Sequence, residues 1–443
     1  MKLNNKRTIL IGFAFLSICA FWQMYDNLIP LILTNTFHMN ETLSGAIMSA
    51  DNVLALFLLP LFGGISDRCK SRLGRRRPFI LVGTLSAVVL MIGLPLLADS
   101  FHASPAPGKL AAFVAVLGLL LIAMGTYRSP AVALMPDVTP KPLRSKANAI
   151  INLVGYIGGI FSTLMMMLLL KSEKGSDGSS HYASGQSFTP IFLVVAAFML
   201  VSVLIMVLTT RENDLVERTR AAVAAGEDAG ACPAKAGERL PSPVLRSLLL
   251  ILLSVFLWFM AYNAVTTAFS RYCVTVWNAD LSTSSGYLMC ATVAAIAAFV
   301  PLGMLSGRVG RKKTILLGIL LMSFCYLSAC FITEQTPVMY LLFALVGIGW
   351  AAINVNSFPM VVEMSTAGDT GRYTGYYYAF SMAAQICTPL LSGLLIDNLG
   401  LGYRVLFPYA VVFSLLSFCT MLMVQHGDSK PPKKGTLEAL DND

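Results

Sequence analysis

The sequence predicts an all-α membrane protein in which twelve helices cross a lipid bilayer. The 443-residue chain is 56% hydrophobic and only 12% charged, and its mean hydropathy is +0.71. So few charges cannot form the hydrated surface of a soluble protein. Apolar runs near the ~20 residues needed to cross a ~30 Å hydrocarbon layer recur along the chain. Helices are expected for these runs, because a helix satisfies its backbone hydrogen bonds internally.

The predicted spans are separated by mostly short connections and cover residues 8–35, 44–63, 79–98, 110–136, 148–170, 190–210, 246–270, 285–305, 314–333, 338–362, 374–396 and 405–425. The first run is too long for the apolar region of a signal peptide and lacks a small-residue cleavage site, so we expect it to remain as a membrane helix. The longest connection lies between the sixth and seventh spans, so it divides the twelve spans into two groups of six. The predicted parts are therefore an N-terminal half (1–210), a linker (211–245), a C-terminal half (246–426) and a tail (427–443). We expect the linker to hold a surface helix followed by a flexible stretch.

The basic residues are distributed unevenly between the two sides of the predicted membrane. Loops on one side hold 26 of the 32 Lys and Arg residues, loops on the other side hold 5, and Arg128 lies within a span. This bias predicts that both termini lie in the cytoplasm and that the chain resides in a plasma or inner membrane. It also accounts for the net charge of +9 without nucleic acid as a partner, and we expect a monomer.

Several function classes are not expected. The four histidines are scattered and offer no metal cluster. The sequence has no G-x-x-x-x-G-K-[ST] nucleotide loop, which argues against an ATP-driven pump. We therefore predict no enzyme activity, no cofactor and no bound metal.

A weak internal repeat relates the two predicted halves. Residues 63–68 read GGISDR after the second span, and residues 303–308 read GMLSGR after the eighth, at an offset of 240. Residues 74–77 (GRRR) and 310–313 (GRKK) follow in the two copies. The repeat includes a second pair of positions: Asp137 and Arg144 follow the fourth span, and Glu363 and Arg372 follow the tenth. A duplicated six-helix bundle with parallel halves suits alternating access around a central substrate.

These motifs resemble those of the major facilitator superfamily. The stretch 303–313 (GMLSGRVGRKK) is similar to the superfamily's loop signature, with Gly307 where an acid usually stands. The stretch 66–80 (SDRCKSRLGRRRPFI) resembles the corresponding loop of sucrose and related glycoside:proton symporters, the glycoside-pentoside-hexuronide type. Residues 127–137 (YRSPAVALMPD) and 144–149 (RSKANA) resemble the fourth and fifth spans of the same branch.

The resemblance implies a gate at the cytoplasmic ends of the helices. In the superfamily such loops hold the halves together while the protein opens outward, and a lone acid such as Asp67 among six cations can join a network. The alternative is a solvated basic loop that only sets topology. The candidate gating residues are Asp67, Arg68, Arg75, Arg76, Asp137, Arg144, Arg308, Arg311, Glu363 and Arg372.

Three ionisable residues stand out within the predicted spans: Asp26, Asp51 and Arg128. Charges at membrane depth are costly and are functional candidates. A carboxylate in a low-dielectric cavity can exchange a proton near neutral pH, and a nearby cation opposes this, which suits proton coupling. Both acids lie toward the outer side of their spans and Arg128 toward the inner side, so direct pairing does not follow from depth.

Alternative interpretations remain for these three charges. Asp51 could merely cap the start of its helix, and Arg128 could extend to the cytoplasm. Sugar porters of the superfamily similarly use a first-span acid with a fourth-span arginine. The sequence departs from its relatives at Leu121 and Thr266, where an acid is expected by resemblance, so coupling depends mainly on Asp26 and Asp51.

Sugar recognition combines amides and hydroxyls with aromatic faces. Amides are the stronger indication, because an unsatisfied amide in lipid costs several kcal/mol, although amides can join helices and aromatic residues can pack or face lipid. The candidate substrate-binding residues are Trp22, Gln23, Tyr25, Asn27, Asn52, Asn152, Tyr156, Trp258, Tyr262, Asn263, Thr266, Asn354, Asn356 and Gln385.

Together these observations predict a secondary transporter that imports a disaccharide or small glycoside with protons. The alternatives are a sodium-coupled glycoside carrier and a drug or solute efflux antiporter of the same superfamily. An efflux protein favours a more apolar pocket than this inventory of Asn and Gln provides. A membrane sensor without transport is a further alternative, but the short linker and tail leave no room for a signalling domain.

Overall fold

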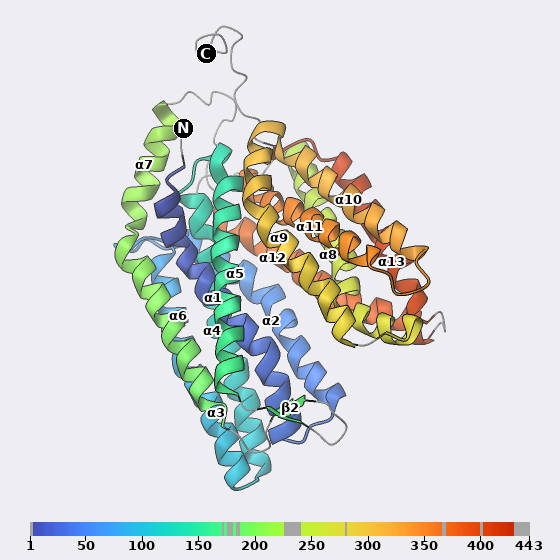
Figure 1. Ribbon diagram of the computed structural model, residues 1–443. Coiled ribbons are helices and arrows are strands. Elements are labelled where there is room, and N and C mark those ends of the chain that lie inside the picture. The colour runs from blue at the N-terminus through green and yellow to red at the C-terminus, as the bar shows by residue number, and fades with distance from the viewer. Residues whose placement is uncertain are drawn as a thin grey trace. The chain divides into compact units, whose positions relative to one another are not determined.

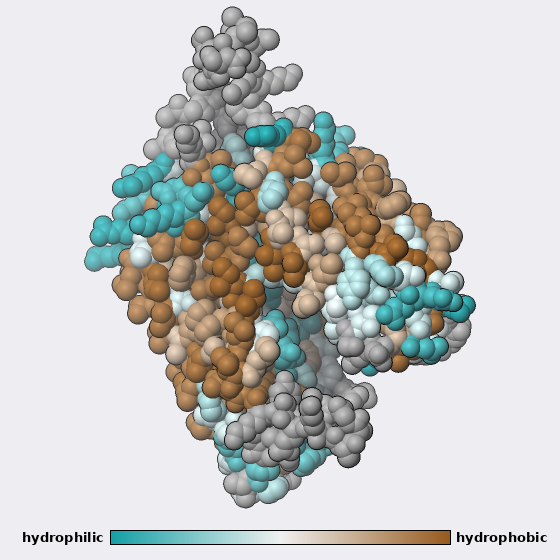
Figure 2. All heavy atoms as spheres, viewed as in Figure 1, coloured by the Kyte–Doolittle hydropathy of each residue, from teal (hydrophilic) through white to brown (hydrophobic). Residues whose placement is uncertain are grey.

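The computed structural model describes residues 3–170, 172–174, 180–182, 187–225, 241–279, 281–365, 369–398 and 402–428. Within these ranges, 12 helices are long and apolar enough to cross a membrane, as the sequence predicts. Large apolar side chains cover their outer surfaces: Phe57, Met167 and Leu208 are 68%, 75% and 72% exposed. Figure 2 shows such residues over much of the visible side of the helices and hydrophilic residues gathered over α7. This distribution suits helices in contact with lipid.

The membrane helices are α1 (Asn5–Leu31), α2 (Glu41–Arg68), α3 (Arg77–Ala103), α4 (Pro107–Asp137), α5 (Arg144–Leu169), α6 (Thr189–Thr209), α8 (Ser242–Trp277), α9 (Leu281–Val309), α10 (Arg311–Cys330), α11 (Val338–Glu363), α12 (Thr370–Gly393) and α13 (Leu406–Leu422). Short π-helical turns extend α1 over Ile32–Thr36 and α12 over Leu394–Asn398, and 3₁₀ turns at Lys141–Leu143 and Tyr403–Val405 precede α5 and α13. Figure 1 shows the helices in their order along the chain.

Several elements differ in extent from the prediction. Helix α8 has 36 residues, about 54 Å at 1.5 Å per residue, and so exceeds the ~30 Å hydrocarbon layer. The linker begins with the expected helix, α7 (Glu212–Ala225), and residues 226–240 lie outside the described residues. Strands β1 (Ser172–Lys174) and β2 (Ser180–Tyr182) pair antiparallel between α5 and α6. The sequence analysis did not anticipate this hairpin.

The helices group into two compact units. Unit 1 comprises residues 1–138, 150–239 and 365–400, and unit 2 comprises residues 139–149, 240–364 and 401–443. In unit 1, α2 packs against α12 and α4, α3 packs against α4 and α6, and α1 packs against α6. In unit 2, α11 packs against α9 and α10, and α13 packs against α8 and α10.

The two units are not identical to the predicted halves. Helix α12 belongs by sequence to the C-terminal half but packs within unit 1, and the start of α5 packs within unit 2. Segments of the two sequence halves therefore meet inside each unit. The division of the chain at residues 210 and 246 stays a prediction.

Candidate functional site

Arg128 of α4 lies between two aromatic rings in unit 1. Its guanidinium carbon is 5.3 Å from the centroid of the Trp22 ring of α1 and 4.9 Å from the centroid of the Tyr378 ring of α12. A cation over an aromatic face gains ~0.5–2 kcal/mol, with the larger values where water is excluded. Three helices thus hold one positive charge inside the membrane-spanning part of the unit.

Both predicted membrane acids lie near this cation. Asp26 of α1 is exposed and Asp51 of α2 is half-buried, and the charge of Arg128 acts on both carboxylates. No ion pair within 4.0 Å involves Arg128 among the described residues, whose pairs are those of Arg76 and Arg311. The cation and the two acids therefore interact electrostatically without direct contact, as the predicted depths indicated.

The alternative role of Asp51 as a helix cap is wrong. Helix α2 begins at Glu41, and its N-cap is Asn40, whose side chain accepts the backbone N–H of Leu43 at 2.8 Å. Asp51 lies well inside the helix. Its Oδ1 accepts the backbone N–H of Asn52 at 2.5 Å.

The aromatic residues beside these charges carry buried polar atoms without partners. Tyr25 is 0% exposed and stacks on Phe21 at a centroid distance of 5.7 Å. Its hydroxyl and the indole N–H of Trp22 have no hydrogen-bond partner within the described protein. Buried polar groups are nearly always satisfied, so these two atoms indicate where a ligand or water bonds.

The other predicted binding residues of unit 1 are less distinctive. Asn27 is exposed and donates its amide to the carbonyl of Gln23 at 2.7 Å. The Gln385 amide of α12 lies 3.7 Å from the sulfur of Met382. The half-buried members of the set are Gln23, Asn52, Asn152, Tyr156 and Gln385.

Unit 2 holds the second group of predicted binding residues, most of them on α8. The Tyr262 ring stacks on the Trp350 ring of α11 with centroids 3.9 Å apart and an interplanar angle of 5°. Trp258, one turn earlier, is 1% exposed. Its indole N–H and the amide nitrogen of Asn263 have no partner within the described protein. Thr266 donates its hydroxyl to the carbonyl of Tyr262 at 3.1 Å.

The two predicted asparagines of α11 differ in their surroundings, and the amide oxygen of Asn356 has no partner within the described protein. Asn356 is 0% exposed and donates its amide to the Ala352 carbonyl of the same helix at 2.8 Å. Asn354 is half-buried, and its backbone carbonyl accepts the amide of Asn148 at 3.2 Å. Asn148, at the start of α5, also donates to the Val355 carbonyl at 3.0 Å. The sequence analysis quoted this residue only within a motif and missed its role as a link between helices.

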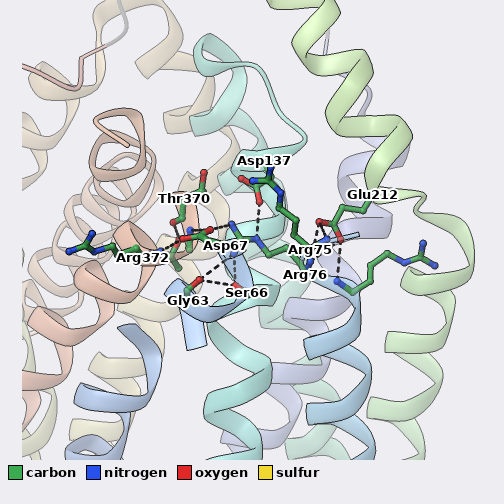
Figure 3. A network of polar contacts seen from close by, with 12 residues as sticks. Gly63, Ser66, Asp67, Arg75, Arg76, Asp137, Glu212, Thr370 and Arg372 are labelled. Atoms are coloured by element: carbon green, nitrogen blue, oxygen red, sulfur yellow. Dashed lines mark hydrogen bonds and ion pairs between the residues drawn. The ribbon is translucent and has the colours of Figure 1, made fainter. Parts of the chain in front are cut away.

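A buried charge network occupies the end of unit 1 where α2 ends and α3 begins (Figure 3). The guanidinium of Arg76 contacts Asp67 at 2.5 Å and Asp137 at 2.9 Å, and the Arg76 side chain is 0% exposed. It also donates to the hydroxyl of Ser66. Burial disfavours the charged guanidinium, but the carboxylates of Asp137 and Asp67 outweigh this and raise the pKa of Arg76. The arginine is thus a permanent cation shared by two helix ends.

Asp67 extends the network to α12. Its carboxylate accepts the backbone N–H groups of Gly371 at 2.9 Å and Arg372 at 2.8 Å. These are unsatisfied donors of the first helical turn, where the helix dipole also favours an anion. Close approach is possible because α2 presents Gly63 to Gly371: a Cβ on either glycine would overlap the other's carbonyl oxygen.

Glu212 completes this network, and the sequence analysis missed it. Its carboxylate accepts the backbone N–H groups of Arg75 at 2.8 Å, Arg76 at 3.0 Å and Arg77 at 3.1 Å, so it caps the start of α3. Burial raises the pKa of Glu212, and the three backbone donors oppose the shift. The only sequence signal was an acid just after the sixth span, beside the basic loop in the same predicted compartment.

Unit 2 repeats this arrangement. Arg311, 2% exposed, forms an ion pair with Glu363 at the end of α11 and donates to the Ser145 hydroxyl at 2.9 Å. Asp428 caps the start of α10 by accepting the Arg311 backbone N–H at 2.7 Å. Gly74 lies shortly before the start of α3, and Gly310 lies immediately before the start of α10. Their φ angles of +112° and +102° favour glycine. The repeat read from the sequence therefore has matching contacts in both units.

The other predicted gating residues contribute less. The Arg144 guanidinium donates to the Thr139 carbonyl at 3.3 Å, and the Arg372 guanidinium donates to the Tyr376 hydroxyl at 2.6 Å. Arg75 takes part through its backbone. Arg308 and Arg68 are both exposed.

This fold and these sites define a membrane transporter: two sets of long helices with charges at membrane depth and a duplicated motif at the helix ends. The chain matches the family model MFS/sugar transport protein over residues 10–425, and it belongs to that family.

Comparisons with individual proteins agree on the fold. The fucose transporter FucP in its outward conformation has a TM-score of 0.67 and 14% identity, covering 95% of this chain and 99% of FucP. The proton:xylose symporter XylE, bound to a bromodeoxyglucose, has a TM-score of 0.66 and 14% identity over 98% of both chains. Human proton-associated sugar transporter A is 53% identical over 47 residues, which make up 11% of this chain and only 6% of that protein.

Proposed function

We propose that the protein is a secondary transporter that imports a disaccharide or small glycoside together with protons by alternating access. The observation that carries the proposal is the position of Arg128 between the rings of Trp22 and Tyr378, with its charge acting on Asp26 and Asp51. The sugar-transport family of the chain and its likeness in fold to two sugar transporters support the same conclusion.

In the proposed coupling, protons and the positive charge of Arg128 compete for the carboxylates of Asp26 and Asp51. Protonation of Asp26 or Asp51 removes a negative charge from the surroundings of Arg128 and changes what the cation and the neighbouring rings can bind. Substrate hydroxyls that bond Tyr25 or Trp22, whose polar atoms lack partners, would in turn alter the environment of the acids. Each event then changes the free energy of the other, which is the requirement for coupled transport.

The proposed gate uses the motif network. With the topology predicted from the basic residues, the contacts of Asp67 with α12 lie on the cytoplasmic side of a plasma or inner membrane. In unit 2, hydrogen bonds likewise join the start of α5 to other helices: Asn148 donates to the Val355 carbonyl of α11, and Arg311 of α10 donates to the Ser145 hydroxyl. Alternating access would require both sets to break when the cytoplasmic side opens.

Uptake into proteoliposomes tests the proposal. Purified protein is reconstituted, and a panel of radiolabelled mono- and disaccharides and glucosides is offered under an imposed pH gradient or an imposed sodium gradient. We expect accumulation of at least one glycoside with the pH gradient, and its collapse on addition of a protonophore.

The other outcomes separate the alternatives. Accumulation with sodium alone identifies a sodium-coupled carrier, and proton-driven extrusion of apolar cations identifies an efflux antiporter. Failure of every sugar under both gradients, with intact vesicles and folded protein, would refute sugar transport.

A further inference from the structure

The start of α1 and the surface helix α7 meet at one carbonyl group in unit 1. The guanidinium of Arg7, in the first turn of α1, donates to the Val138 carbonyl at the end of α4, at 3.2 Å. The Thr219 hydroxyl of α7 donates to the same oxygen at 3.1 Å. Figure 1 shows α7 beside the start of α1. The two hydrogen bonds therefore fix α7 against the ends of two membrane helices.

A second arginine lies within electrostatic range of Arg7. Arg218 immediately precedes Thr219 on α7, it is exposed, and its positive charge acts on the Arg7 guanidinium. Among the described residues, no ion pair within 4.0 Å involves either arginine. This holds for Asp214 and Glu217, the acids of α7 nearest to Arg218 in sequence, which are exposed. Two like charges are thus held near each other without a paired negative charge to offset their repulsion.

Most N–H donors of the two guanidinium groups have no acceptor. Each guanidinium carries five N–H donors. Within the described protein, the Arg7 side chain bonds only the Val138 carbonyl, and the Arg218 side chain forms no hydrogen bond. The exposed Lys6 adds a third positive charge beside Arg7. The arrangement therefore suits an anion that accepts hydrogen bonds from both α1 and α7.

Phosphate is the anion whose chemistry fits this position. The planar fork of a guanidinium matches the oxygens of a phosphate group and can bond two of them at once. Arg7 immediately precedes the first predicted span, which begins at residue 8, so it lies at the edge of the hydrocarbon layer, where lipid headgroups carry phosphates. With the topology predicted from the basic residues, this edge faces the cytoplasm, where anionic lipids and soluble phosphate compounds are both available.

We propose that Arg7 and Arg218 form a binding site for a phosphate group between the start of α1 and α7. The phosphate belongs either to an anionic lipid headgroup or to a soluble compound, because both present the same acceptor oxygens. A bound phosphate offsets the repulsion between the two arginines and joins α7 to α1 more firmly. The site uses none of the residues assigned to sugar binding, proton coupling or the gate, so it is independent of the proposed function.

Affinities of the purified full-length protein in a neutral detergent, measured by isothermal titration calorimetry, test the site. The probes are dioctanoyl phosphatidylglycerol, dioctanoylglycerol, which has the same acyl chains without the phosphate, and inorganic phosphate. The variants are Arg7→Gln, Arg7→Lys and Arg218→Gln. Arg218 has no internal hydrogen bond to lose, so its substitution leaves the protein's own contacts intact.

Arg246→Gln is the matched control. Arg246 is also an exposed arginine near the start of a membrane helix, α8, and it lies on the same predicted side of the membrane. It has no ion pair within 4.0 Å among the described residues, and no second arginine acts on it. The control therefore removes one equivalent surface charge without touching the pair of Arg7 and Arg218.

The expected results depend on the pair of arginines. The wild type should bind phosphatidylglycerol more tightly than dioctanoylglycerol. Arg7→Gln and Arg218→Gln should each weaken phosphatidylglycerol binding at least about tenfold, as expected for the loss of a hydrogen bond to a charged group. Arg7→Lys keeps the charge but not the planar fork and should not retain full affinity. Arg246→Gln should weaken binding no more than about fivefold, the effect of one charge near an anionic surface.

Inorganic phosphate distinguishes the two sources. Phosphate binding with the same dependence on Arg7 and Arg218 would show that a soluble phosphate is sufficient. Phosphatidylglycerol binding without phosphate binding would identify the lipid headgroup. Equal affinities for phosphatidylglycerol and dioctanoylglycerol, together with no binding of phosphate, would overturn the site. Equal losses of affinity in Arg218→Gln and Arg246→Gln would also overturn it, because the attraction would then belong to the whole basic surface.

Discussion

At the scale of single residues, the functional importance of an acid depends on partners that a linear motif does not reveal. Asp67 was predicted as a gating residue from its motif; it bonds Arg76 and α12, and the gating role stays a prediction. Glu212 and Asp428 have equivalent positions as caps of α3 and α10. They lie in the linker and the tail, where acids are common and no periodicity selects one of them, so the sequence did not identify either.

Substitution of Glu212 should loosen two helix starts. Glu212→Ala removes the acceptor of three N–H groups, a loss that typically costs ~0.5–2 kcal/mol, or a two- to thirtyfold faster hydrogen exchange where exchange follows this opening. We expect faster exchange at the amides of 75–77. Because Arg76 then loses its backbone anchor and Asp67 loses a fixed partner, exchange at Gly371 and Arg372 should also rise.

Hydrogen exchange followed by mass spectrometry measures both regions in one experiment. Glu217→Ala is the matched control, since Glu217 lies on the same helix and is exposed. If Glu212→Ala accelerated exchange at 75–77 and left 371–372 unchanged, Glu212 would be a local cap with no link to α12.

The pKa of Glu212 gives a prediction with a definite sign. Burial raises the pKa above its ordinary value, near 4.3, so the folded protein binds this proton more tightly than the unfolded chain does. The stabilisation from this proton is fully present below the unfolded pKa and is lost as the pH rises through the raised folded pKa. The thermal midpoint of Glu212→Gln should therefore increase relative to that of the wild type as the pH rises above the ordinary glutamate pKa near 4.3. A flat or opposite trend in detergent would contradict the raised pKa.

At the scale of elements, the sequence predicted which segments are helices better than where they end. All twelve spans are present because each is a long apolar run. Helix α8 extends beyond its predicted end at residue 270, because residues 271–277 (RYCVTVW) continue the helix past the charged Arg271. The hairpin of β1 and β2 has three residues per strand, too short for a clear periodicity. The pairing of α2 with α12 required structure, since Gly63 belongs to a motif but Gly371 does not.

Glycine substitutions test the α2–α12 contact. Gly63→Ala places a Cβ against the Gly371 carbonyl, so a backbone must shift, whereas a Cβ at Gly64 meets nothing within 4 Å. Overpacking typically costs ~1–3 kcal/mol, and alanine is ~1 kcal/mol better than glycine within a helix. Gly63→Ala should lower the thermal midpoint and uptake, while Gly64→Ala should retain both. Equal behaviour of the two variants would argue against a close α2–α12 contact.

At the scale of the whole molecule, composition and charge placement predicted the membrane class, and the motifs predicted the family. For the candidate sites, the sequence predicted the charged residues but not all of their neighbours. Arg128, Asp26 and Asp51 were found because charges are rare in apolar runs, but their surroundings include Tyr378, which the sequence did not connect to Arg128.

The proton-coupling assignment is a property of the full transport cycle, and Asp26→Asn tests it. The amide mimics a permanently protonated carboxyl and cannot release a proton, so proton-driven accumulation of sugar should vanish. Exchange of sugar already present on both sides requires no net proton movement and should survive. Accumulation and counterflow are measured on one preparation, with Asp99→Asn as a control: Asp99 accepts the Ser187 hydroxyl at 2.6 Å near the far end of α3. Retained accumulation in Asp26→Asn would transfer the role to Asp51. Loss of both activities would make Asp26 a substrate ligand or a structural partner, and not the proton carrier.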